Sequence, residues 1–273
     1  MLVCLIMKLK KPKFWDYQKP NLLSNILLPF SKIVELKSKF QIKEKKKFKE
    51  IISICVGNIY LGGTGKTTLA IEIKKILDKR NVKSCFIKKK YSNQIDEQIL
   101  LKKFGKTFIN KSRINALKTA ISEKYQIAIF DDGLQDKNIE YDLALVCFNQ
   151  KNKIGNGRVI PAGPLRENLD ILKNYKNIFL NGNDNENTSF KKFLSDKFPN
   201  LDFFETKYEI LNLKNFNKED QFIVFSGIGN HKTFIEMLRI NHFKIIEDFE
   251  YPDHYNYSIM DIKRINDTAV KYN

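Results

Sequence analysis

Short apolar runs alternate with segments of helical periodicity along the chain from residue 51 onward. The runs are typical of buried strands and read IISICV, KSCFI, KTFI, QIAIFDD and DLALVCF. Between them, apolar positions recur at helical spacing in TTLAIEIKKILDKR, IDEQILLKKF and SRINALKTAISEK, the last with Ser112 as a predicted cap. Strands that alternate with helices predict an α/β fold, a parallel sheet with helices on both faces. Ligands of such folds bind at the carboxyl ends of the strands.

A loop rich in glycine and proline, QKNKIGNGRVIPAGPLREN, changes the pattern near residue 150. Beyond it we expect a smaller alternating region, with strands NIFL, FFETKYEI, QFIVFS and FKIIEDFEY and helices at about 189–198 and 231–239. The pattern therefore predicts an N-terminal segment (1–50), a first α/β domain (51–150) and a second, smaller α/β domain (151–273).

The segment NLLSNILLPFSKIVELKSKF has apolar residues at helical spacing, flanked by lysines. The predicted apolar side consists of Leu22, Leu23, Ile26, Leu27, Phe30, Ile33 and Val34. Pro29 is expected to bend or interrupt the helix. Two interpretations are open at this point: an ordinary helix packed on the protein, or a basic amphipathic helix on an anionic membrane surface.

Composition narrows the class of protein only in part. The chain has 273 residues, 42% of them hydrophobic, which is typical of a globular protein, and a formal net charge of +17. That excess favours nucleic acid, anionic membrane or phosphorylated partners, although lysine is abundant throughout. No apolar run is long enough for a transmembrane helix, and the start, with Met7 as an alternative first residue, lacks the order of a secretory signal. The four cysteines form no CxxC pair, so we expect a protein of the reducing cytoplasm.

The stretch VGNIYLGGTGKTTLA follows the first predicted strand and opens a helix, the context of a phosphate-binding P-loop. Tyr60 stands where the Walker pattern has its first glycine. Leu61 stands where the variant P-loops of partitioning ATPases have a lysine. Lys66 is expected to reach the β- and γ-phosphates and the Thr67 hydroxyl to ligate Mg²⁺. The predicted nucleotide-binding residues are Gly62, Gly63, Thr64, Gly65, Lys66, Thr67 and Thr68.

A second motif, QIAIFDDGLQD, has Walker B character, because an apolar strand delivers Asp131 and Asp132 after the P-loop helix. A carboxylate at this position holds the Mg²⁺ that bridges the phosphates. Together the two motifs predict binding of ATP or GTP with Mg²⁺.

Phosphoryl transfer to a hydroxyl also needs a base and further cations. Three clusters offer such groups: Asp96-Glu97 after the second strand, Arg166-Glu167 in PAGPLRE, and His254 in YPDHY. Taken from the residues alone, each has an ordinary alternative: a helix cap, a surface ion pair and a surface histidine.

The motifs VGNIYLGGTGKTT, IDEQ, FDDGLQ, GNGRVIPAGPLRE, FSGIGN and YPDHY, with KPKFW near the start, occur in the order seen in the tetraacyldisaccharide 4′-kinase (lipid A 4′-kinase) family. The resemblance runs from about Lys11 to the end of the chain. It implies transfer of phosphate from ATP, with Mg²⁺, to the 4′-hydroxyl of a tetraacylated glucosamine disaccharide 1-phosphate in lipid A biosynthesis. It also implies a peripheral protein on the cytoplasmic face of the inner membrane, and it favours the membrane-docking interpretation of the N-terminal helix. We expect a monomer that binds no nucleic acid.

By motif match, the resemblance gives Asp96 the role of the base, with His254 as its partner, and makes Lys66 and Arg166 the groups that stabilise the transferring phosphoryl. The magnesium residues it implies are Thr67, Asp131, Asp132 and Glu167.

The chain also departs from the family pattern. Its Ser-Arg-Gly-Tyr is KKKY here (88–91), the glycine before the acidic pair is Ile95, and two histidines are Asp136 and Tyr255. The expected Thr-Glu-Lys-Asp segment near the C-terminus does not occur, so we expect a C-terminally shortened member. The rival hypothesis is a regulatory or partitioning P-loop ATPase that acts on a protein or nucleic-acid partner. That hypothesis leaves PAGPLRE and YPDHY without a role.

Overall fold

The computed structural model describes residues 11–40, 44–91, 94–182 and 188–272 and divides into two compact units. The larger unit is Pro12–Thr206, and the smaller is built from Lys207 onward. Met7, the alternative first residue, lies outside the described residues.

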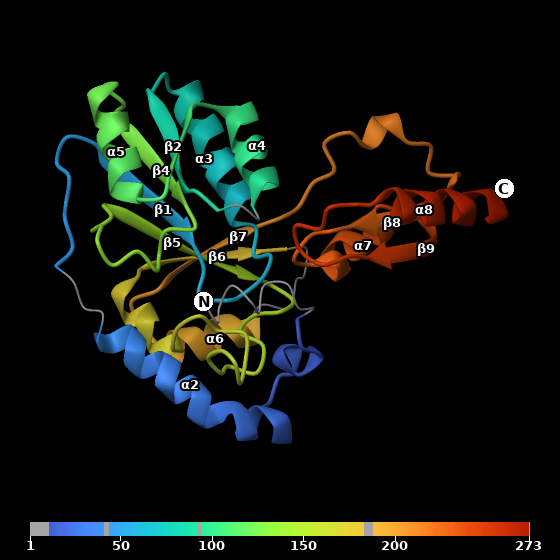
Figure 1. Cartoon of the computed structure of the whole chain (residues 1–273), viewed down its shortest axis with the longest axis horizontal. Helices are drawn as coiled ribbons and strands as arrows, with labels where there is room; N and C mark the ends of the chain where they lie inside the picture. The colour runs from blue at the N-terminus through green and yellow to red at the C-terminus, as the bar shows by residue number, and fades with distance from the viewer. Residues whose placement is uncertain (1–10, 41–43, 92–93, 183–187, 273) are drawn as a thin grey trace. The chain divides into compact units, whose positions relative to one another are not determined.

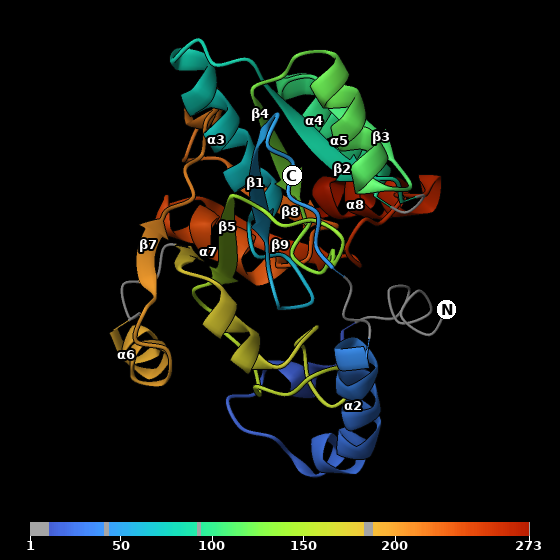
Figure 2. The ribbon, with the colours of Figure 1, turned by 90° about the vertical axis from the view of Figure 1, so that its left-hand side faces the viewer.

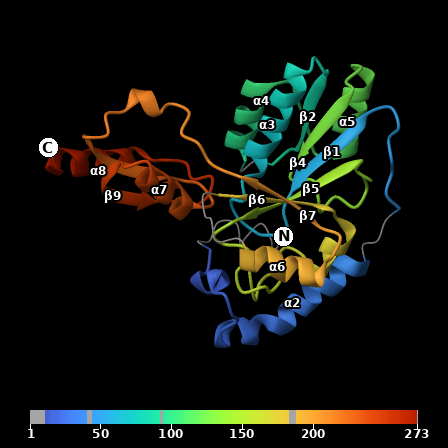
Figure 3. The same cartoon turned by 180° about the vertical axis from the view of Figure 1, so that it is seen from behind.

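A seven-stranded parallel sheet forms the larger unit, in the order β3-β2-β4-β1-β5-β6-β7 (Figure 1). Its first five strands are β1 (Ile52–Gly57), β2 (Ser84–Lys89), β3 (Thr107–Asn110), β4 (Ile127–Asp131) and β5 (Leu143–Asn149). Helices α3 (Lys66–Lys79) and α4 (Ile95–Phe104) lie on one face and α5 (Arg113–Ser122) on the other, as Figure 3 also shows from behind. This confirms the predicted α/β fold, and the ends of these elements agree with the sequence pattern to within two residues.

The sheet continues beyond residue 150 with β6 (Asn177–Asn181) and β7 (Asp202–Thr206), joined by α6 (Thr188–Lys197). The glycine- and proline-rich loop, together with the 3-10 turn η2 (Leu169–Asn174) that follows it, therefore connects two neighbouring strands of one sheet. The sequence placed β6 and β7 in the second domain, because periodicity identifies a strand without identifying the sheet that it joins.

Strands β1, β4 and β5 form the centre of the hydrophobic core, with side chains such as Val56, Ile129 and Cys147 fully buried. Burial raises the pKa of the thiols of Cys85 and Cys147 to about 12. At neutral pH these cysteines are protonated and pack as small hydrophobic side chains.

Helix α2 (Leu22–Phe40) follows the 3-10 turn η1 (Lys13–Asp16) and runs without interruption through Pro29 (Figure 2). Six of its apolar side chains are between 48% and 77% exposed: Leu22, Leu23, Ile26, Phe30, Ile33 and Leu36. Within the described residues, neither this helix nor another combines the length and hydrophobicity that crossing a membrane requires.

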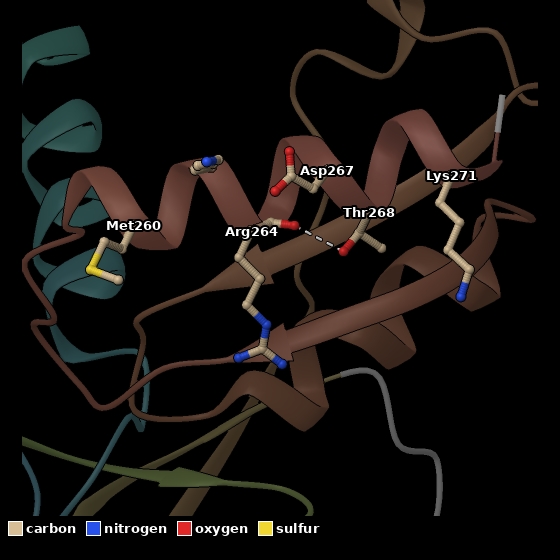
Figure 4. A pocket seen from close by; sticks show the side chains of 6 residues that line it. Met260, Arg264, Asp267, Thr268 and Lys271 are labelled. Atoms are coloured by element: carbon tan, nitrogen blue, oxygen red, sulfur yellow. Dashed lines mark hydrogen bonds between the residues drawn. The ribbon is translucent and has the colours of Figure 1, made fainter.

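The smaller unit has a two-stranded parallel sheet, β8 (Gln221–Ser226) and β9 (Lys244–Glu250), with helices α7 (His231–Ile240) and α8 (Ile259–Tyr272) and the turn η3 (Leu213–Asn215). These strands and α7 agree with the prediction, whereas the sequence pattern gave no expectation for α8. An open groove runs along α8 between Met260 and Lys271 and contains none of the predicted site residues (Figure 4).

Candidate active site

The P-loop lies between the end of β1 and the start of α3, as predicted. Gly65 precedes the helix with a φ of 80°, a left-handed conformation that favours glycine. Lys66 is the first residue of α3, so the free N–H groups of the first helical turn point toward the loop. This arrangement is the usual protein site for a phosphate.

Two buried asparagines hold the loop in shape. The side-chain amide of Asn58 donates to the Tyr60 carbonyl (2.6 Å) and to the Thr64 hydroxyl (2.9 Å). From the end of β6, Asn181 donates to the Thr64 carbonyl at 2.5 Å. Neither residue was predicted: Asn58 lies in the P-loop stretch but matches no motif position, and only the folded sheet brings Asn181, at the end of β6, beside the loop.

Tyr60, at the position of the missing glycine, is a buried anchor with 1% of its surface exposed. Its hydroxyl donates to the Asp16 carboxylate at 2.6 Å. Burial, reinforced by Asp16, raises the pKa of Tyr60 far above its usual value, so the hydroxyl stays a donor. On the backbone, Leu61 N donates to Pro164 O (2.8 Å) and Arg166 N to Ile59 O (2.7 Å), which pairs the P-loop entrance with the PAGPLRE loop.

Asp131 ends β4 beside the P-loop helix, in the Walker B position. Its Oδ2 accepts a hydrogen bond from the Thr67 hydroxyl at 3.0 Å. Its buried Oδ1 has no hydrogen-bond partner among the described residues. A hydroxyl and an open carboxylate oxygen suit Mg²⁺, which binds proteins through one or two such ligands plus phosphates and water. Among the described residues, no group of three or more His, Cys, Asp or Glu side chains could hold a metal ion.

Lys88, in the KKKY segment, is the unexpected member of the site. Its side chain is 1% exposed and its Nζ lies 2.7 Å from Asp131 Oδ2 and in contact with the Glu97 carboxylate. Burial alone would lower the pKa of Lys88, but Asp131 and Glu97 raise it above its usual value. Lys88 therefore stays charged and joins β2 to the Walker B strand and to the first turn of α4.

Asp132 brings Arg166 and Lys66 together. The Arg166 guanidinium donates to both carboxylate oxygens of Asp132, at 2.9 and 3.0 Å, and Lys66 Nζ lies 3.9 Å away. Burial opposes ionisation of Asp132, yet Arg166, Lys66 and Lys88 hold its pKa well below the usual range. Two cations thus converge on one carboxylate next to the phosphate loop.

Glu167 lies beside this group. Gln135 accepts a hydrogen bond from Arg166 (3.2 Å) and donates to the Asn58 carbonyl (2.8 Å) and to Glu167 (3.5 Å). Burial raises the pKa of Glu167 above its ordinary value. The structure therefore places the predicted Arg166-Glu167 pair next to the P-loop and the Walker B strand, and Gln135 is a connecting residue that the sequence analysis missed.

Asp96 and His254 lie in different units. Asp96 is exposed in the first turn of α4, next to Glu97, which contacts Lys88. His254, with a positive φ of 58°, belongs to the smaller unit, where its N–H donates to Gly227 O at 3.0 Å. Their pairing stays a prediction.

Comparisons with known proteins agree on one family. A family model described as tetraacyldisaccharide-1-P 4′-kinase matches residues 22–273. A tetraacyldisaccharide 4′-kinase of Pelagibacter ubique (strain HTCC1062) is 56% identical over 267 residues, which cover 98% of this chain and 85% of that protein. One from Rickettsia canadensis (strain McKiel) is 31% identical over 286 residues, with 98% and 85% covered. In fold, the chain is similar to LpxK from Aquifex aeolicus, solved in complex with ATP, with a TM-score of 0.66, 24% identity, and 87% of this chain and 84% of that chain covered.

Proposed function

The chain belongs to the tetraacyldisaccharide 4′-kinase family of lipid A biosynthesis, and from this premise we propose how its own residues carry out the reaction. ATP donates its γ-phosphoryl group to the 4′-hydroxyl of a tetraacylated glucosamine disaccharide 1-phosphate. The observation that carries the proposal is the convergence of Lys66 and Arg166 on Asp132 beside the P-loop. A generic nucleotide-binding fold has no need of the second cation, whereas phosphoryl transfer does.

In this proposal, backbone N–H groups of the loop from Gly62 to Thr68 hold the nucleotide phosphates, and Lys66 reaches the transferring group. Thr67 and Asp131 would hold Mg²⁺, which supplies charge neutralisation between the phosphates, with Asp132 and Glu167 in support. The open Oδ1 of Asp131 supports this assignment, because a buried carboxylate oxygen normally has a partner.

Arg166 has a second role once the substrate is present. In this structure its guanidinium donates hydrogen bonds to Asp132 and Gln135, and a transferring phosphoryl group would compete with them for the same guanidinium. Asp96, at the carboxyl end of the sheet, takes the proton of the 4′-hydroxyl, and His254 is its partner during turnover. A base placed in this way contributes about 10²- to 10⁴-fold to the rate.

The acceptor is a lipid, and we propose that the protein works as a peripheral protein at the anionic cytoplasmic surface of the inner membrane. The exposed apolar side chains of α2 supply the area for such contact, and lysines that include Lys32 and Lys37 supply charge complementary to anionic lipids.

The test is transfer of label. Purified protein with Mg²⁺ and γ-labelled ATP should label a tetraacyl disaccharide 1-phosphate dispersed in detergent. Absence of label in the lipid, together with ATP hydrolysis that DNA stimulates, would support the rival regulatory ATPase and end the kinase proposal.

A further inference from the structure

Helix α2 has a second side, which is polar and buried. Ser24 and Ser31 are two helical turns apart, so they share one side of the helix, and neither has any exposed surface. Apolar contact alone would favour alanine or leucine here, because serine is a weaker helix former. The two hydroxyls must therefore be explained by the groups that they bind.

Both serines bind the backbone of the loop that leads to Arg166. The Ser24 hydroxyl donates to Ala162 O at 2.6 Å, and the Ser31 hydroxyl donates to Val159 O at 2.8 Å. Ser31 also accepts a hydrogen bond from Ala162 N at 3.1 Å. The Ala162 N–H is buried, and the loss of its Ser31 partner would cost about 1–3 kcal/mol. The Ala162 and Val159 carbonyls each have a second donor, the Asn156 side chain and Gly163 N, so the serines add to these bonds.

The turn before α2 contacts the same loop. Trp15 Nε1 donates to Pro161 O at 3.0 Å, and Asn156 N donates to Trp15 O at 3.0 Å. The Asn156 side chain donates to Ala162 O at 2.9 Å and lies 3.3 Å from the Ser24 hydroxyl. The N-terminal segment and the loop thus share one buried hydrogen-bond network. Figure 2 shows α2 beside the yellow-green loop.

Backbone hydrogen bonds of the loop connect this network to the P-loop. Ile160 N donates to Leu165 O (2.9 Å), and Leu165 N donates to Arg158 O (3.0 Å). These two backbone hydrogen bonds join the two ends of the segment 158–165, directly before Arg166. Arg166 N then donates to the P-loop residue Ile59. The Tyr60–Asp16 hydrogen bond ties the P-loop to the N-terminal turn by a second route.

We propose that α2 is the scaffold of the phosphoryl-transfer loop, with Ser24 and Ser31 as positioning residues for Arg166, so that the helix that meets the membrane also sets the geometry of the site. The partner of its exposed side is a bilayer of anionic lipid, and this part rests on the proposed function. Contact with lipid would hold α2 in place and, through the serines, reduce the opening of the loop at residues 156–166.

The first experiment compares the wild type, the double variant Ser24→Ala/Ser31→Ala, and the control variant Ser122→Ala, each as the full chain. Ser122 is an exposed helical serine whose hydroxyl bonds only to Thr119 O in its own helix. Hydrogen exchange of the amides at 156–166 is measured first, because it requires no substrate. The double variant should exchange at least about 10-fold faster in this loop, with no comparable change at β1 or β4. Vesicles of phosphatidylethanolamine and phosphatidylglycerol should slow the exchange in the wild type and in the Ser122→Ala control, but not in the double variant.

Kinetics provide the second readout. The double variant should keep nucleotide affinity and vesicle binding within about 2-fold while kcat falls roughly 10- to 100-fold, because a small displacement of a positioned group is costly. Ile26→Glu/Phe30→Glu should do the reverse: weak vesicle binding and unchanged kcat on detergent-dispersed lipid.

Unchanged exchange in the double variant, or exchange that rises equally throughout the larger unit, would overturn the inference. If hydrogen exchange at residues 156–166 and kcat are also unchanged in the single variant Ser31→Ala, the two serines contribute only to packing, and the inference is wrong. A protein that shows the loop effect but transfers no phosphate to lipid would refute the proposed function and leave the scaffold intact.

Discussion

Asp131 is held in place by the hydroxyl of Thr67 and the ammonium of Lys88, both on the same carboxylate oxygen. The other oxygen, Oδ1, is buried and has no hydrogen-bond partner among the described residues, and we propose that Mg²⁺ binds there. Asp132, one residue later, is held by Arg166 and Lys66 instead. At the residue scale, the two adjacent carboxylates therefore contact different cations.

The residues that the sequence could identify are those whose chemistry is concentrated in a short motif. Lys66, Thr67 and the two aspartates stand in recognisable patterns, and the structure places them beside one another. Lys88 gave no such signal, because a lysine near the end of a strand is ordinarily solvated. Its partners lie on β4 and α4, and only the three-dimensional arrangement shows that it is buried.

Lys88→Met should lower the free energy of unfolding by about 3 kcal/mol, because the substitution leaves Asp131 without its buried counter-charge. The control is Lys75→Met, which removes an exposed ion pair with Glu72 and should cost less than about 1 kcal/mol. Urea denaturation measures both. Equal, small losses would show that Lys88 is solvated rather than buried.

Asp96→Ala should reduce kcat by at least about 100-fold and leave the affinity for ATP nearly unchanged, since a base acts on the acceptor. Isothermal titration with a non-hydrolysable ATP analogue checks binding. Glu72→Ala, an exposed carboxylate on α3, serves as the control. A loss of nucleotide affinity in the Asp96 variant would instead assign it a structural role.

Glu167→Gln should stabilise the protein at pH 7 and have little effect near pH 4. Burial raises the pKa of Glu167 in the folded state, so the wild type loses stability as the pH rises from the unfolded value, about 4.3, through the folded one. A glutamine carries no charge and avoids this loss. Thermal unfolding at several pH values gives the answer, and a Tm difference that does not vary with pH would contradict the burial argument.

At the element scale, Tyr60 explains why the P-loop lacks its first glycine. The strands and helices of the larger unit follow from apolar periodicity, and the short motifs fall at their ends as expected. Periodicity could not reveal that the P-loop entrance pairs with the PAGPLRE loop or that its tyrosine reaches the N-terminal turn. Such contacts join residues far apart in the chain and leave no local pattern.

Tyr60→Gly, which restores the standard motif, should therefore lower the free energy of unfolding by about 3–5 kcal/mol, the usual cost of removing a buried aromatic ring. We expect no gain in ATP affinity. Tyr60→Phe, which loses only the bond to Asp16, should cost about 1–2 kcal/mol. A glycine variant that is stable and binds ATP more tightly would show that the ring has no anchoring role.

At the scale of the whole molecule, the phosphate site is built entirely within the larger unit, and His254 belongs to the smaller one. The sequence suggested a boundary near residue 150, where the loop composition changes, whereas the seven-stranded sheet includes residues on both sides of that loop. Arg166 and Glu167 therefore reach the P-loop from a connection inside the sheet domain.

The most direct test of the account is to locate the transferred phosphate. After reaction of the full-length protein with Mg²⁺, ¹⁸O-labelled γ-phosphate ATP and a tetraacyl disaccharide 1-phosphate, tandem mass spectrometry identifies the position of the new group. The account predicts labelled phosphate at the 4′-oxygen, which accumulates at least about 100-fold more slowly with the Asp96→Ala protein. Label released only as inorganic phosphate, or label at another hydroxyl, would contradict it.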